Sequence, residues 1–168
     1  MINIQLMNTN TKPQINSISS KKLVGLSKEM SLINNKSFEL FYNFAKQKEQ
    51  INAVSSDIYE VIIYNKNYFK KFNPSNNFEK WVTLEVFDSE SVPEGMNVLI
   101  LEKELYAVFN YRGTMKDFGS FMNYIFTEWL PQSNYELDNR PHFQILGNKY
   151  KHNQPDSEEE VWIPIKTK

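Results

Sequence analysis

The stretch Glu160-Val-Trp-Ile-Pro-Ile165 constrains the fold of this chain more than any other. Aliphatic side chains occupy every second position: Val161, Ile163 and Ile165. This period of two predicts a β-strand that turns one face toward a hydrophobic core. The opposite face carries Glu160, Trp162 and Pro164. The strand therefore predicts a sheet that packs on helices at one face and presents aromatic and acidic groups at the other.

The elements that precede this strand are predicted by the same kind of pattern. Residues 141–146 and residues 106–111 are rich in β-branched and aromatic side chains and predict two strands. Residues 114–130 predict a long helix, with Thr114 as its N-cap and Pro131 at its end. The helix is predicted from apolar side chains at three- and four-residue steps: Phe118, Phe121, Met122, Ile125, Phe126 and Trp129.

The first half of the chain repeats this order of elements. Residues 22–27 predict a strand, and residues 38–48 show the apolar spacing of a helix. Residues 57–64 and 81–87 then predict two further strands. Residues 88–95, which include a proline and a glycine, form the linker between the halves.

The two halves also align in detail, since Tyr59 falls on Phe143 and Trp81 falls on Trp162. We therefore predict an α+β fold of two βαββ repeats related by a pseudo-twofold axis. Its antiparallel sheet would carry the two long helices on one face and a ligand cleft on the other.

The expected domain organisation follows from these repeats. Residues 1–20 are polar and are expected to form a flexible N-terminal segment. Residues 21–168 are expected to form a single domain, with repeat one at about residues 21–88 and repeat two at about residues 96–168.

Alternation assigns further side chains to the face opposite the helices. In the first half these are Glu60, Ile62, Tyr64, Trp81, Thr83 and Glu85. In the second half they are His142, Gln144 and Leu146, together with the three residues of the last strand, whereas Phe143 and Ile145 are expected in the core. Aromatic walls with a few polar groups are typical of small-molecule pockets, and a carboxylate beside aromatic rings suits an organic cation. The alternative is that the tryptophans pack loops and Glu160 belongs to a solvated acidic run.

Composition and charge exclude several classes of protein. The formal net charge of −1 lacks the basic excess of nucleic-acid-binding domains, so we expect no direct DNA binding. The chain has no cysteine, which excludes disulfides and thiolate metal sites and fits a cytoplasmic location. No apolar run approaches the ~20 residues of a membrane span, and the first residues lack the pattern of a signal peptide. His142 and His152 have no matching carboxylate spacing, so we expect neither a metal nor another cofactor.

Four motifs of the second half resemble GyrI-like, AraC-type effector-binding domains. They are Tyr106-Ala-Val-Phe-Asn-Tyr-Arg-Gly113, Trp129-Leu-Pro-Gln-Ser-Asn-Tyr135, Arg140-Pro-His-Phe143 and Glu159-Glu-Val-Trp-Ile-Pro-Ile165. The first half resembles the family at Lys22-Leu-Val-Gly-Leu26, so the resemblance covers about residues 20 to 168. It implies paired βαββ repeats around a hydrophobic cleft that binds lipophilic, often cationic, small molecules.

The resemblance also implies which residues form the site. The acid of the family's pocket falls on Glu160, and the aromatic residue two positions later falls on Trp162. A second pocket acid falls on Gln144, which is a departure, because a neutral amide weakens both cation selectivity and a two-carboxylate mechanism. We add Trp81, Tyr64 and Tyr111 as stacking surface, which completes the predicted ligand-binding set, and we assign no catalytic residue.

Three functions are compatible with this sequence. The first is a binding domain for lipophilic aromatic, including cationic, small molecules. The second is a hydrolase of reactive electrophilic natural products, as in a subset of the family, with Glu160 as general acid or base. The third is a module that binds a protein partner, as a gyrase inhibitor does. We expect a binding domain rather than an enzyme, because Gln144 replaces one of the two acids.

Overall fold

The computed structural model describes residues 10–87 and 92–168 and confirms an α+β fold. The first repeat contains β2 (Lys21–Met30), α1 (Ser37–Ala45), the short 3-10 turn η2 (Lys48–Gln50), β3 (Ile58–Tyr64) and β4 (Phe78–Val86). The second contains β6 (Leu105–Arg112), α2 (Met115–Tyr124), the π-helical turn η3 (Ile125–Trp129), α3 (Leu130–Gln132), β8 (His142–Leu146) and β9 (Glu158–Thr167). Each repeat therefore has the predicted order of strand, helix, strand and strand.

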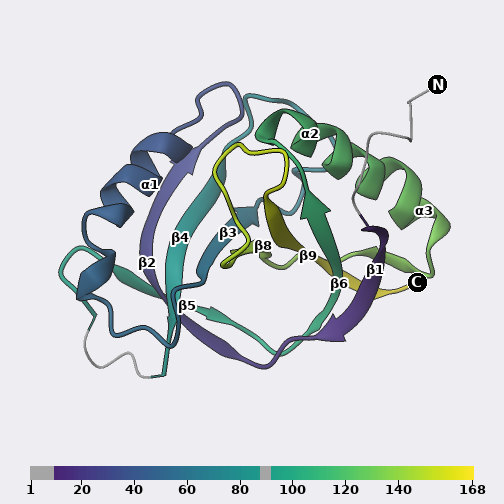
Figure 1. Cartoon of the computed structure of the whole chain (residues 1–168). Coiled ribbons are helices and arrows are strands. Elements are labelled where there is room, and N and C mark those ends of the chain that lie inside the picture. The colour runs from purple at the N-terminus through teal and green to yellow at the C-terminus, as the bar shows by residue number, and fades with distance from the viewer. Residues whose placement is uncertain (1–9, 88–91) are drawn as a thin grey trace.

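The described residues form a nine-stranded antiparallel sheet, of which eight strands follow the pseudo-twofold order β1-β6-β9-β8-β3-β4-β2-β5, with β1 (Asn10–Ser17) and β5 (Asn97–Leu101) at its ends. The ninth strand, β7 (Tyr135–Leu137), pairs with β9 beside this path. Equivalent strands of the two repeats stand at equal distances from the centre of this order, and the central strands are β3 and β8. The sheet curls, and α1 and α2 lie on its outer side (Figure 1). We call this side the helix face and the opposite side the inner face.

Three strands were not predicted from the sequence: β1 (Asn10–Ser17), β5 (Asn97–Leu101) and β7 (Tyr135–Leu137). β1 pairs with β6 of the second repeat, and β5 pairs with β2 of the first, so each repeat is extended at its outer edge. Residues 10–17 are thus part of the sheet and not of a flexible segment. Residues 1–9 and 88–91, the latter within the expected linker, lie outside the described residues.

The helix face buries a core under each helix. Leu40 and Phe44, one turn apart on α1, pack on β2 and β4 with Val24 and Val82 among their neighbours. Phe121 and Ile125 repeat this arrangement beneath the second helix, where they meet side chains of β6 and β9. Pro131 does not stop the helix at once, because the helical path continues to Gln132.

Gly25 is the place where β2 and β4 come closest together. A Cβ atom there would lie 2.0 Å from the carbonyl oxygen of Val82 and 2.8 Å from the Cα of Thr83. No side chain fits in that space, so only glycine allows this approach of the two strands. Gly25 pairs directly with Thr83 of β4, and both residues lie on the inner face.

Candidate functional site

The inner face carries a hydrophobic cluster that is separate from the two cores under the helices. We call it the inner cluster, and its buried members are Ile18, Leu23, Tyr59, Val61, Trp81, Leu101, Tyr106 and Phe143. Trp162 and Ile63 pack against it and remain partly exposed. Trp81 and Trp162, which the repeat aligned, therefore lie on the same face of the sheet. The sheet therefore carries apolar clusters on both of its faces.

Aromatic rings form the centre of the inner cluster. The Phe143 ring stacks on Trp162 with centroids 5.1 Å apart, and Tyr106 meets Phe143 edge-on at 5.1 Å. Tyr59 lies 6.2 Å from Phe143 on the other side. Because these side chains come from β3, β6, β8 and β9, the cluster joins both repeats. Rings in such contacts present flat apolar surface that can receive an aromatic ligand.

Two carboxylates stand at one end of the inner cluster, near the Tyr59 hydroxyl. Glu160 is exposed and accepts a hydrogen bond from Trp162 Nε1 at 2.9 Å. Glu85 accepts one from Tyr59 Oη at 3.3 Å. Burial raises the pKa of Tyr59 well above its ordinary value, and the negative charges of Glu85 and Glu160 raise it further. The Tyr59 hydroxyl therefore stays protonated, and the carboxylates of Glu85 and Glu160 both lie close enough to raise its pKa.

One buried donor on the inner face has no acceptor. Trp81 is 8% exposed, and its Nε1 atom has no hydrogen-bond partner among the described residues. A buried polar group without a partner costs about 1–3 kcal/mol. The inner face thus holds a polar atom whose hydrogen bond no residue in the described part of the chain satisfies.

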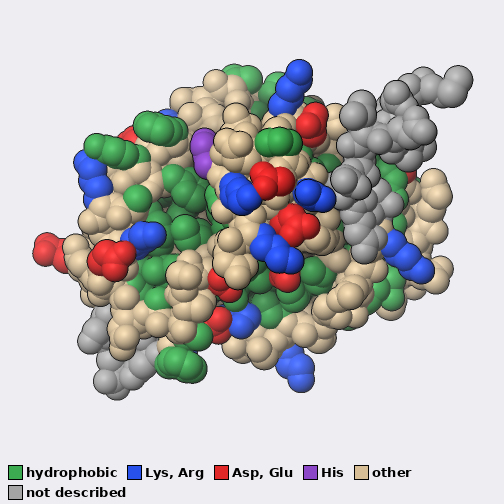
Figure 2. Space-filling view, viewed as in Figure 1, with side chains coloured by type: hydrophobic (Ala, Val, Ile, Leu, Met, Phe, Trp, Pro, Cys, Tyr) green, Lys and Arg blue, Asp and Glu red, His purple; other side chains and the backbone are tan. Residues whose placement is uncertain are grey.

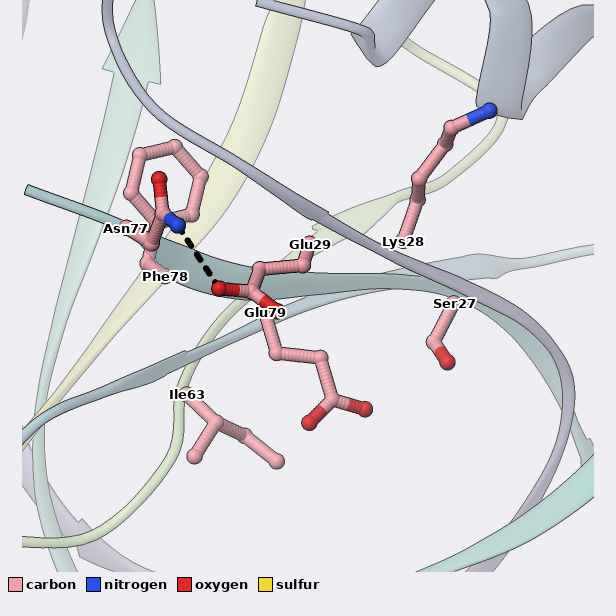
Figure 3. A pocket seen from close by; sticks show the side chains of 7 residues that line it. All are labelled: Ser27, Lys28, Glu29, Ile63, Asn77, Phe78 and Glu79. Carbon is pink, nitrogen blue, oxygen red and sulfur yellow. Dashed lines mark hydrogen bonds between the residues drawn. The ribbon is translucent and has the colours of Figure 1, made fainter. Parts of the chain in front are cut away.

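An open depression of about 310 Å³ lies at the opposite end of the inner face. Figure 3 shows the side chains of Ser27, Ile63 and Glu79 directed into this space. Glu79 stands directly across from Glu29 in the β2–β4 pairing, and Asn77 donates a 2.7 Å hydrogen bond to Glu29. Ile63 also packs against the inner cluster, so the depression adjoins it.

Figure 2 shows hydrophobic side chains in a hollow of the molecular surface, next to a group of acidic and basic side chains. Apolar area and charge are thus accessible side by side on this side of the molecule. Binding sites for amphipathic molecules combine the same two properties.

The predicted position of Gln144 was wrong. In the β8–β9 pairing Phe143 stands across from Trp162, and Gln144 stands across from Val161. Phe143 and Ile145 therefore lie on the inner face, and Gln144 lies on the helix face, where Nε2 donates to Glu159 Oε2 at 2.7 Å. The more apolar side of β8, Phe143 and Ile145, faces the inner cluster, and the polar side faces the helices, so the assumption that the apolar side packs under the helices fails for this strand.

Tyr64 and His142 also lie on the helix face, contrary to prediction. The two rings meet edge-on at 4.9 Å, and Phe69 stacks on the imidazole at 5.5 Å. Phe126 of the second repeat lies 6.2 Å from His142. Burial, helped by the charge of Arg140, lowers the pKa of His142 to about 3. His142 is therefore a neutral packing residue between the repeats and does not face the inner cluster.

Tyr111, near the end of β6, also lies on the helix face, next to the start of α2. Its hydroxyl donates a 2.5 Å hydrogen bond to the carbonyl oxygen of Thr114, and its ring contacts Phe118 and Phe121. Thr114 occupies the N-cap position, as predicted, but its hydroxyl bonds to the Asp117 side chain and not to a helix N–H group. Tyr111 thus connects the end of β6 to α2, and it has no access to the inner face.

The helix face contains a polar cluster between the two repeats. Lys80 Nζ lies 2.7 Å from Glu60 and 2.9 Å from Ser37 Oγ, and both partners of the ion pair are 12% exposed. Burial and the neighbouring Glu60 raise the pKa of Glu159 to about 7, although Gln144 and Lys80 oppose that shift. The adjacent residues Glu159 and Glu160 thus occupy opposite faces of β9 and different environments.

Sequence reasoning missed the residues that complete the inner face. Tyr59, Phe143 and Tyr106 were absent from the predicted site, and Glu85 was placed on the correct face without a role. The alignment of Tyr59 with Phe143 and of Trp81 with Trp162 was the signal that could have found the first two. Of the six predicted site residues, the structure brings together Glu160, Trp162 and Trp81.

The described residues contain no cluster of three or more histidine, cysteine or carboxylate side chains that could hold a metal ion. Within the same part of the chain, no helix has the length and hydropathy needed to cross a membrane.

Comparison with known proteins assigns the chain to a class of small-molecule-binding domain. The family model of the GyrI-like small molecule binding domain matches residues 11–166, so the chain belongs to the GyrI-like family. No curated protein sequence matches the chain. The family membership confirms the resemblance seen in the second-half motifs.

Solved structures share the fold at low sequence identity. SAV2435 bound to tetraphenylphosphonium has a TM-score of 0.69 at 15% identity, covering 92% of this chain and 94% of its own. The EcmrR C-terminal domain has a TM-score of 0.71 at 11% identity, covering 96% and 100%. A hydrolase encoded by lin2189 from Listeria innocua has a TM-score of 0.60 at 9% identity, covering 98% and 96%. At these identities the similarity shows the fold alone.

Proposed function

We propose that the inner face binds lipophilic aromatic molecules, with a preference for those that carry a positive charge. The observation that supports this most is the position of two carboxylates, Glu85 and Glu160, beside an aromatic cluster drawn from both repeats. Aromatic rings attract cations through their faces, and nearby carboxylates add charge pairing. Tetraphenylphosphonium, bound by the structurally similar SAV2435, has this chemistry.

In this proposal the partly exposed Trp162 supplies stacking surface and the buried Phe143 supports it from the other side, while Glu160 is the exposed acid that meets the ligand first. The Nε1 atom of Trp81 would donate to a ligand acceptor, since no described residue accepts from it. We further propose a cytoplasmic protein that senses or sequesters such compounds without contacting DNA itself. The near-neutral charge and the absence of cysteine support this.

Tryptophan fluorescence can test this function directly. The chain has three tryptophans, and Trp129 packs against Phe109 on the helix face, so a Trp129→Phe background leaves only the inner-face reporters. We expect tetraphenylphosphonium to quench this variant saturably and a neutral analogue, triphenylphosphine oxide, to bind more weakly. A Trp162→Phe change in the same background should remove most of the signal. Absence of saturable quenching by both compounds would contradict the proposal.

A second candidate is hydrolysis of a reactive electrophile. The replacement of an acid by Gln144 argued against it in the sequence, but Gln144 lies on the other face and Glu85 supplies a second carboxylate near Tyr59. Glu160 would then act as general acid or base on a water molecule. Incubation with a strained electrophile, followed by mass spectrometry, separates the two functions. Hydrolysed product lost in Glu160→Gln would favour the enzyme, and quantitative recovery of intact compound would favour binding alone.

A further inference from the structure

Lys21, the first residue of β2, lies among the groups that we propose recognise a cationic ligand. Its Nζ atom is 3.0 Å from Glu85 Oε1 and 3.1 Å from Oε2, so it contacts both oxygens. The same ammonium lies 5.9 Å from the centroid of the Tyr59 ring. A carboxylate and an aromatic ring are the two groups that attract an organic cation.

The position of this lysine is fixed on the inner face. Lys21 pairs with Leu101 on β5, and Leu101 is a buried member of the inner cluster. The side chains of Lys21 and Glu85 are only 20% and 21% exposed. The other paired lysine of β2, Lys28, contacts Glu39 of α1 at a more exposed position. Of these two lysines, only Lys21 is directed toward the inner cluster.

Glu85 also accepts from Tyr59 Oη, so two groups, from β2 and β3, converge on this carboxylate of β4. With its charge balanced by Lys21, Glu85 attracts a second cation weakly, whereas Glu160 and Asp57, whose charges also act on Tyr59, form none of the ion pairs seen among the described residues. A cationic ligand that used Glu85 would have to displace the ammonium. A neutral ligand would have no such competitor.

We propose that Lys21 is an intramolecular competitor that occupies the Glu85 subsite and sets the charge selectivity of the inner face. This inference rests on the proposed binding function and adds a specificity-determining residue to it. It predicts that loss of the lysine charge strengthens the binding of lipophilic cations and leaves neutral analogues nearly unaffected. Lys21 thus restricts the compounds that the domain retains.

The test is a titration of wild type and Lys21→Met with tetraphenylphosphonium and with triphenylphosphine oxide, by calorimetry at low salt. Methionine keeps the apolar stem and removes the charge. We expect the cation to bind about five- to tenfold more tightly to the variant, a change equivalent to one partly screened charge pair, and the neutral compound to change less than twofold. Lys21→Gln is a second neutral variant should Lys21→Met fold poorly.

Three controls make the result specific. Lys21→Arg keeps the charge and should behave like wild type, and Lys22→Met, which removes the adjacent exposed lysine of the same strand, should change neither affinity. Adding Glu85→Gln to Lys21→Met should abolish the gain, because the freed carboxylate is then gone. The gain should also shrink at high ionic strength.

The outcomes separate this inference from the function on which it rests. Suppose that wild type binds tetraphenylphosphonium and that Lys21→Met and Lys21→Gln bind it no more tightly. The inference about Lys21 is then overturned, and the proposed function stands. If the gain persists in the Glu85→Gln background, competition for Glu85 is likewise excluded. If no protein binds either compound, the proposed function fails, and this inference fails with it.

Discussion

Phe143 and Trp162 stand across from each other on β8 and β9, with their rings stacked at an interplanar angle of 18°. This pairing belongs to the β8–β9 register, which decides the face on which each side chain of these two strands lies. It turns Gln144 toward the helices and leaves Glu160 on the same face as the aromatic cluster. The chemistry of the inner face therefore depends on the β8–β9 register.

Removal of the Phe143 ring should destabilise the fold strongly. The side chain is 2% exposed and contacts Tyr59, Tyr106 and Trp162. We expect Phe143→Ala to lower the free energy of unfolding by about 3–5 kcal/mol, the range for buried phenylalanines. Urea denaturation measures this. Phe38→Ala is the matched control, because Phe38 is 85% exposed and its loss should cost less than about 0.5 kcal/mol.

Replacement of Gly113 should destabilise the fold, and most strongly when Tyr111 keeps its hydroxyl group. Gly113 has a φ of 153°, and a Cβ atom there would lie 2.7 Å from Tyr111 Oη. We expect Gly113→Ala to lower the free energy of unfolding by about 2–3 kcal/mol, through backbone strain and this overlap. In a Tyr111→Phe background the cost of the same substitution should be smaller. Equal costs in both backgrounds would show that the hydroxyl plays no part.

His142 should make the protein less stable in acid. Its pKa is about 3 in the folded protein, against an ordinary value of 6.5. Between pH 3 and pH 6.5 the unfolded chain therefore binds one more proton at this residue than the folded protein does. The stability from neutral His142 is present above pH 6.5 and is lost as pH falls toward 3. The loss at pH 5 should be about 2 kcal/mol. His142→Phe should remove this contribution to the pH dependence, whereas His152→Gln, at an exposed position, should leave it unchanged.

Glu159 should have the opposite effect on the pH dependence. Its pKa is raised from 4.5 to about 7. Between pH 4.5 and pH 7 the folded protein therefore binds one more proton at this residue than the unfolded chain does. The associated stability is present below pH 4.5 and is lost as pH rises through 7. We expect Glu159→Gln to stabilise the protein by about 1–2 kcal/mol at pH 8 and to have little effect at pH 4.5. The two opposing slopes partly cancel in wild type, so thermal unfolding of the single variants across pH 4.5–8 is needed to see them. A variant less stable than wild type at pH 8 would contradict this account.

The order of elements could be predicted from the sequence because it depends on local periodicity. The stripe on residues 114–130 and the alternation in β4 and β9 each have one clearly apolar face, and the structure confirms all three elements. The outer strands β1 and β5 could not be found in this way, since their pairing with β6 and β2 is a long-range contact.

The site was predicted only in part for a related reason. In β9 the aliphatic residues were sufficient to place Glu160 and Trp162 on the face away from the helices. In β3 and β8 the apolar side faces the inner cluster, whereas Glu60 and Gln144 face the helices, so the assumption that polar side chains point away from the helices placed Tyr64 and Gln144 on the wrong face. Register between strands, and not composition within a strand, decides such cases.

Glu159 and Glu160 provide the most direct test of the central claim, because they are adjacent in sequence and lie on opposite faces of β9. Dissociation constants for tetraphenylphosphonium should be measured by calorimetry for Glu160→Gln and Glu159→Gln at the same pH and ionic strength. If the inner face binds the ligand, Glu160→Gln should weaken binding by about tenfold, a value typical of one charge-assisted contact, and Glu159→Gln should change it less than twofold. A loss in Glu159→Gln with Glu160→Gln unaffected would place the ligand on the helix face and contradict the account.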